Sequence, residues 1–290
     1  MGKKDEIIKA ISKDKFVSVA VINAKEMTEY ARKIHNTTPV VTAAMGRMLS
    51  ISSIVGSDMK KADASLTTRI NGGGPVGTIL VVTDSFGNPR CFVQNPKADL
   101  PKNAGDKLDV GGVVGRDGVL TVIRDLRGKE PYIGSTELIS GEIAEDFAVY
   151  FAESEQVPSV CALGVLVDRD RSVIAAGGYL VRLLPGAPDG VIDRLEENVA
   201  KTGSVTEVLK QDGGAELLLQ SVMNGFSPRI LSRENVEYKC TCSRERFLSA
   251  ILSLSKAELT DMKEKGEPIE TSCQFCGAVH NFELDEIFAE

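Results

Sequence analysis

The chain has 290 residues, of which 42% are hydrophobic and 26% charged, with a formal net charge of −7. This length suits about two domains of a soluble globular protein. The acidic balance, the lack of tryptophan and the 5% aromatic content disfavour a general nucleic-acid binder, which needs clustered cations and stacking surfaces.

The start of the chain lacks the apolar core of a signal peptide, and no apolar run approaches the length of a membrane span. We therefore expect a cytoplasmic protein with no membrane partner. In that compartment, paired cysteines indicate metal or redox chemistry rather than structural disulfides.

The first elements mix one strand with two helices. Residues 16–23 are rich in β-branched side chains and predict a strand. Residues 25–35 then predict a helix. Pro39 opens a second helix over residues 40–59, because proline suits the first turn. This helix has a broad apolar face, so we expect it at the centre of the core.

From residue 65 the apolar pattern changes to the period of two typical of strands. Residues 65–71, 77–84 and 91–94 predict an antiparallel meander with turns at 72–75 and 87–89. The run Gly72-Gly-Gly-Pro75 lacks the Lys-Ser/Thr ending of a phosphate-binding loop, and no helix follows it. We therefore interpret it as a hairpin turn.

The mixture of helices and strands continues to residue 183. Residues 141–155 predict an amphipathic helix with acidic residues in its first turn. Apolar alternation predicts further strands at 118–125, 133–140, 159–167 and 172–183. Gly177-Gly178 indicates a bulge or a close backbone approach. Cys91 and Cys161 lie singly inside strands, and we interpret them as core thiols.

A boundary follows at 185–190, which is rich in proline and glycine. Three short helices are predicted beyond it, at 191–201, 204–213 and 215–224, the second beginning with a capping box at Ser204-Val-Thr-Glu207. Each is too short to be stable alone in water. We expect these helices to lean on a neighbouring surface and to be among the first parts to open.

The last part, from about Val236, predicts a small module with few large apolar residues. Ser243 caps one helix, a second capping box begins at Ser255, and residues 269–273 and 278–282 predict a hairpin. A domain this small usually needs a metal or disulfides to stay folded. The sequence therefore predicts an α+β protein with a core at 1–184, a helical linker at 185–235 and a zinc-binding module at 236–290.

Four of the six cysteines lie in that module as two close pairs, Cys240-Thr-Cys242 and Cys273-Gln-Phe-Cys276. Two such pairs can supply the four ligands of a tetrahedral Zn²⁺ site. Gly277 follows the second pair and can adopt positive φ, which turns backbone N–H groups toward the sulfurs. His280 is an alternative ligand that would leave one thiol free, but the all-cysteine set needs no residue outside the two motifs.

A zinc ion with four thiolate ligands has no open position for water, which argues against hydrolytic chemistry. Thiolates react with oxidants, and each cysteine has a neighbour that can trap a sulfenic acid as a disulfide. Oxidation would release the metal and remove the folding energy of the module. The marginal helices at 185–235 are placed to unfold with it and to uncover apolar surface.

Two alternatives use the same cysteines. One is a zinc-ribbon nucleic-acid-binding protein, for which the sequence offers a modest basic cluster at Arg229, Arg233, Lys239, Arg244 and Arg246. In an acidic chain we interpret this cluster as a solvated face. The other is a thiol oxidoreductase, but its CxxC motif normally lies near a βαβ pattern rather than in a terminal hairpin.

The sequence resembles the heat-shock protein 33 family of redox-regulated bacterial chaperones over nearly its whole length. The resemblance rests on both cysteine pairs and on four further motifs: Gly141-Glu-Ile-Ala-Glu-Asp146, Ser154-Glu-Gln-Val-Pro158, Gly73-Gly-Pro75 and Ala175-Ala-Gly-Gly178. The four cysteines show no departure from the family pattern.

The resemblance implies an ATP-independent holdase, not an enzyme, which is inactive when reduced and zinc-bound. It implies that oxidation forms the disulfides Cys240–Cys242 and Cys273–Cys276 with zinc release. It further implies an active homodimer that binds unfolding client proteins during oxidative and heat stress. The fold it implies is a mixed α/β core followed by a helical linker and a zinc module.

Overall fold

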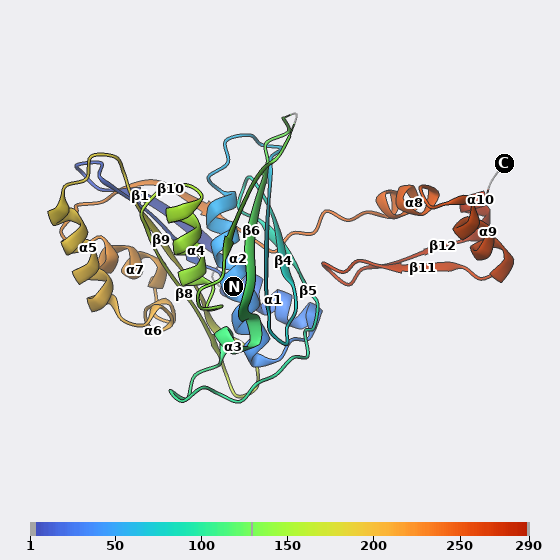
Figure 1. Ribbon diagram of the computed structural model, residues 1–290, viewed down its shortest axis with the longest axis horizontal. Helices are drawn as coiled ribbons and strands as arrows, with labels where there is room; N and C mark the ends of the chain where they lie inside the picture. Colours follow the sequence, from blue (N-terminus) through green and yellow to red (C-terminus); the bar gives the residue numbers. More distant parts are fainter. Residues whose placement is uncertain (1–3, 129, 289–290) are drawn as a thin grey trace. The chain divides into compact units, whose positions relative to one another are not determined.

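The computed structural model describes residues 4–128 and 130–288. Residues 1–3, which begin the segment expected not to be a signal peptide, lie outside the described residues. By its internal contacts the chain divides into two compact units, Met1–Tyr238 and Lys239–Glu290. Figure 1 labels helices and strands of both units where there is room.

Two antiparallel sheets of five strands frame the described part of the first unit (Figure 1). The first has the order β10-β1-β2-β9-β8, formed by Arg229–Asn235, Glu6–Ile11, Val17–Asn23, Val173–Leu183 and Ser159–Val167. The second has the order β5-β4-β3-β6-β7, formed by Pro89–Val93, Ile79–Asp84, Ser65–Gly73, Gly115–Asp125 and Tyr132–Glu137. The predicted meander is confirmed as β3, β4 and β5.

Helix α2, Pro39–Gly56, forms the centre of the larger core and packs against strands of both sheets. Its N-terminus follows the sequence signal: Pro39 lies in the first turn, and the hydroxyl of Thr38 accepts a hydrogen bond from the Val41 amide. The helix is long and apolar enough to cross a membrane, but 89% of it is buried inside the fold. It is therefore the predicted core helix.

Helix α1, Lys25–His35, also covers this side of the first sheet and ends at Asn36 in the left-handed conformation. Its N-terminus is held by the buried carboxylate of Asp5. That carboxylate accepts hydrogen bonds from the amides of Glu26, at 3.0 Å, and Met27, at 2.6 Å. The first residues of β1 are thereby joined to the helix.

Helix α4, Ala144–Glu153, follows the short helix α3, Val110–Val114, and the strands β6 and β7. The acidic residues in its first turn do more than complement the helix dipole. Asp146 is fully buried and its carboxylate accepts four backbone N–H groups, at 2.9–3.3 Å, from Ile139, Ser140, Gly141 and Ile143. This one side chain fixes the loop that leads into the helix.

Three helices cover the opposite face of the first sheet (Figure 1). They are α5, Asp189–Thr202, α6, Val205–Leu209, and α7, Gly214–Val222. The approach of α6 is close: a Cβ built on Gly177 would lie 2.1 Å from the Ile22 carbonyl oxygen and 2.9 Å from a Leu209 methyl group. The predicted close approach at Gly177 is therefore confirmed. The predicted capping box at Ser204 is wrong, because the Ser204 side chain makes no cap hydrogen bond at the start of α6.

The described part of the second unit contains three helices: α8 (Arg244–Leu252), α9 (Lys256–Lys265) and the short α10 (Leu284–Phe288). Between α9 and α10 lies a hairpin of β11 (Ile269–Ser272) and β12 (Val279–Phe282). Ser243 caps α8, and Ser255 and Glu258 form the predicted capping box of α9. The apolar cluster of this unit has only three buried side chains among the described residues: Ile251, Phe282 and Ile287.

The predicted class, a mixed α/β fold with antiparallel sheets, is confirmed. Two strands were missed: β1 and β10, which pair with each other at the edge of the first sheet. Strand β10 lies within the segment predicted as a helical linker. The compact units separate at Tyr238/Lys239, and the finer division at residues 184 and 235 stays a prediction.

Candidate metal centre

The second cysteine pair lies in the turn between β11 and β12. The Cys273 amide donates to the Ala278 carbonyl at 2.8 Å, and the Gly277 amide donates to the Cys273 carbonyl at 2.7 Å. Gly277 has φ of +71°, as its position predicted. This tight turn directs the amides of Phe275 and Cys276 at the Cys273 sulfur, and that of Ala278 at the Cys276 sulfur.

The first pair lies in the extended segment just before α8. Arg246, in the first turn of that helix, donates to the Thr241 carbonyl at 2.9 Å and to the Thr241 hydroxyl at 3.2 Å. The cap hydrogen bond from the Arg246 amide to Ser243 fixes the start of the helix immediately after Cys242. Arg246 thus fixes Thr241, the residue between the two cysteines, from one side. The sulfurs of Cys240 and Cys242 are free to face the turn at Cys273.

The four sulfurs gather in one cluster. Their ligand atoms all lie within 4.8 Å of one another. Sγ of Cys240 is 3.7 Å from Sγ of Cys273, and Sγ of Cys242 is 3.4 Å from Sγ of Cys276. A tetrahedral zinc–thiolate site with bonds of about 2.3 Å requires sulfur–sulfur distances of about 3.8 Å. The cluster therefore has the size and donor set that a single Zn²⁺ ion needs.

The electrostatics of the cluster favour a cation. Burial raises the thiol pKa at Cys273, but hydrogen bonds from the backbone of Phe275 and Cys276 and with the sulfurs of Cys276 and Cys240 together outweigh it, and the net pKa is lowered. At Cys242 burial, together with the adjoining sulfurs, raises the pKa, and at Cys276 burial again raises it. Since like charges this close repel, a metal ion that neutralises the thiolates would favour their ionised form.

Other sequence candidates lie elsewhere. His280 is outside the cluster, and its ring packs 5.0 Å from the ring of Phe247. Cys91 is fully buried in the larger core, where desolvation raises its pKa to about 12, as expected of a core thiol. Cys161 lies in β8 and packs against the same core.

Two residues of the predicted basic cluster are paired with carboxylates, which reduces the positive charge available to a nucleic acid. Arg233 binds Glu216 at 2.6 Å. Arg244 binds both carboxylate oxygens of Glu286 at 2.7 Å and lies over the ring of Phe282. These contacts favour a structural role for both arginines.

Comparison with known proteins matches the whole architecture. A family model described as "Hsp33 protein" matches residues 5–283. A 33 kDa chaperonin of Agathobacter rectalis is 43% identical over 98% of both chains, and one of Clostridioides difficile is 43% identical over 98% of this chain and 97% of its own. The crystal structure of a 33 kDa chaperonin from Thermotoga maritima, titled a heat shock protein 33 homolog, superimposes with a TM-score of 0.91 at 33% identity, covering 98% of this chain and 97% of that one.

Proposed function

This chain belongs to the Hsp33 family, and from that premise we propose that it is a redox-regulated, ATP-independent holdase. In this proposal the reduced, zinc-bound protein is inactive, and oxidation of four cysteines activates it. The observation that carries the proposal is the four-thiol cluster within a unit that has few buried apolar side chains. Such a unit depends on its metal for stability.

We propose Cys240, Cys242, Cys273 and Cys276 as the zinc ligands. Zinc held by four thiolates has a closed coordination sphere and supplies folding energy rather than a reactive water. Structural zinc sites contribute on the order of 10–16 kcal/mol at neutral pH. The three buried side chains of the apolar cluster in the second unit contribute far less, at about 1.5–3 kcal/mol each. The state of the cysteines therefore decides whether this unit is folded.

We propose that an oxidant such as peroxide converts the pairs Cys240–Cys242 and Cys273–Cys276 to disulfides. Each disulfide forms when one sulfur is oxidised to a sulfenic acid and its neighbour displaces water, so two electrons pass to the peroxide. Two sulfur contacts in the cluster, at 3.7 and 3.4 Å, join the two motifs. Pairing within each motif consequently dismantles the tetrahedral arrangement, and the unit loses both its metal and its fold.

The three helices α5–α7 provide the route from this unit to client binding. They bury the apolar side chains of β1, β2 and β9, among them Ile8, Val19, Val21, Tyr179 and Val181. None of the helices exceeds 14 residues, so they are not stable without this surface. Once they open, the exposed face can hold unfolding client proteins. In line with the family, we propose that the active form is a cytoplasmic homodimer and that the protein is a binding protein rather than an enzyme.

The experiment measures zinc release, loss of free thiols and client aggregation on the same sample. Peroxide with mild heating should release about one zinc per chain, because four ligands make one site, and should consume four thiols. The same sample should then suppress aggregation of a denatured client. A Cys161→Ser variant should respond like the wild type, whereas Cys242→Ser should bind zinc weakly even when reduced. Unchanged client aggregation after full oxidation would refute the proposal.

A further inference from the structure

Strand β10 is one of the two edge strands of the first sheet, and few apolar contacts hold it there. It pairs with β1 along one edge, with a register irregularity between Lys9 and Ala10. Most of its residues are exposed, including the apolar Ile230, at 40%, and Leu231, at 54%. Since the strand buries little apolar surface, its attachment rests mainly on backbone hydrogen bonds and a few polar side chains.

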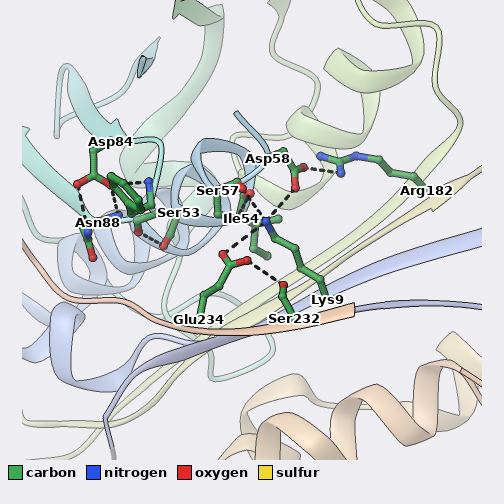
Figure 2. Close-up of polar contacts among 12 residues, drawn as sticks. Lys9, Ser53, Ile54, Ser57, Asp58, Asp84, Asn88, Arg182, Ser232 and Glu234 are labelled. Carbon is green, nitrogen blue, oxygen red and sulfur yellow. Dashed lines mark hydrogen bonds and ion pairs between the residues drawn. The ribbon is translucent and has the colours of Figure 1, made fainter. Parts of the chain in front are cut away.

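Figure 2 shows the polar contacts on one side of this strand. Glu234 accepts a hydrogen bond from Ser232 at 2.8 Å and lies 3.5 Å from the ammonium group of Lys9. Lys9 has two further partners, the Ser57 carbonyl at 2.6 Å and Asp58 at 3.3 Å, and Asp58 also binds Arg182 at 2.6 Å. Lys9 therefore keeps a carboxylate and a carbonyl if Glu234 departs.

On the other side, Arg233 joins β10 to α7 and β1 through Glu216, at 2.6 Å, and Glu6, at 3.7 Å. All three side chains are about one-third exposed or more. Ion pairs this exposed contribute little, at about 0–1 kcal/mol each. The departure of β10 thus leaves no buried charge unpaired, so the strand can separate from β1 at small cost in side-chain energy.

Separation would uncover two surfaces that meet along β1. One is the backbone edge of β1, a row of N–H and C=O groups now paired with β10. The other is the face on which Ile8 and Ala10 lie with Val19 and Val21, now covered by α7 and its neighbours. Both covers come from one continuous segment, Asp189–Asn235.

We propose that the edge of β1 binds an extended segment of the unfolding client by antiparallel strand addition. In the inactive protein, β10 occupies the same edge and blocks it. This inference rests on the proposed holdase function and gives it a binding mode. The main chain of any unfolded protein offers the required hydrogen bonds, whatever its sequence, and every second side chain can lie on the apolar face. The occupant we infer is therefore an extended polypeptide with alternating apolar residues.

The test is residue-resolved amide exchange on the full-length protein, reduced, oxidised, and oxidised with a denatured client. In the middle strand of three, successive N–H groups point to opposite neighbours. The β1 amides directed at β10 should exchange at least tenfold faster after oxidation and should regain protection when client binds. The alternate β1 amides, directed at β2, should change little and serve as the internal control.

A competition measurement adds a second readout. A peptide of residues 229–235 should reduce suppression of client aggregation by the oxidised protein. The same peptide carrying both Ser232→Pro and Arg233→Pro should not, because these adjacent residues pair with Lys9 and Ile8, successive N–H groups of a strand point to opposite sides, and proline removes the one directed at β1. Slow exchange at the β10-directed amides in the oxidised protein would overturn the inference. So would fast exchange at those amides while client is bound and aggregation suppressed, an outcome that leaves the holdase function standing. Failure to suppress aggregation at all would instead refute the proposed function.

Discussion

The coupling between the short helices and activation can be tested by one buried leucine. Leu218 on α7 is fully buried in the cluster formed with β1, β2 and β9, whereas its neighbour Leu217 is 37% exposed. Truncating a fully buried leucine to alanine costs about 2–5 kcal/mol. If α5–α7 open as a local unit, Leu218→Ala should raise their open population by about 30-fold to several thousand-fold, since about 1.4 kcal/mol corresponds to a factor of ten.

The assay uses reduced, zinc-loaded protein without oxidant. Leu218→Ala should speed proteolytic cleavage within residues 189–222 and should suppress client aggregation partially before any thiol is oxidised. Leu217→Ala is the matched control, because it changes the same residue type on the same helix but removes about half a kcal/mol or less. Equal cleavage and equal inactivity of the two variants would refute the idea that this surface holds the protein in its inactive form.

Three further predictions concern other parts of the chain. Cys273→Ser should abolish stoichiometric zinc binding and unfold residues 239–290 under reducing conditions, measured by zinc content and proteolysis; a folded, zinc-loaded variant would contradict it. Tyr238→Phe removes the hydroxyl that accepts the Cys91 amide at 3.1 Å and should cost about 1–3 kcal/mol in urea unfolding, so an unchanged midpoint would count against this contact. Burial raises the pKa of Asp5 from its ordinary value of 3.8 to about 7. The stabilising contribution of this carboxyl is therefore complete below pH about 4 and is lost as pH rises through about 7. Asp5→Asn should flatten the fall in stability between pH 5 and 8, and an unaltered slope would exclude this carboxyl as the cause of that fall.

The features best predicted from sequence are those encoded by neighbouring residues. The turn at Cys273–Gly277, the cap at Ser243 and the capping box at Ser255 depend on a few adjacent side chains, and all three are confirmed. The meander β3–β5 follows from alternation between glycine turns. The capping box expected at Ser204 failed because the hydroxyl turned instead to Thr206, at 3.1 Å, which a sequence pattern cannot exclude.

The features missed depend on partners distant in the chain. Strand β1 is covered on both faces, with Ile7 in one core and Ile8 in the other. Its adjacent apolar residues therefore do not alternate, and the pattern resembles a helix as much as a strand. Strand β10 is polar and exposed, so its identity comes from pairing with β1 more than 200 residues earlier. In neither strand do the neighbouring residues indicate which strand it pairs with.

The same long-range pairing supplies a physical link for the proposed control of a distant surface by the metal motif. Between β10 and the first cysteine, three consecutive residues are fixed to the core: the Val236 amide binds the Asp5 carbonyl at 3.1 Å, the Glu237 amide binds the Asn88 side chain at 3.0 Å, and Tyr238 contacts Cys91. Tyr238 precedes Cys240 by only two residues. In the mechanism that we propose, unfolding of the second unit after metal loss reaches this anchor first and β10 next, because both immediately precede that unit along the backbone. The order of release is thus set by chain connectivity, and the weakly held edge strand needs no contact with the metal centre to respond to it.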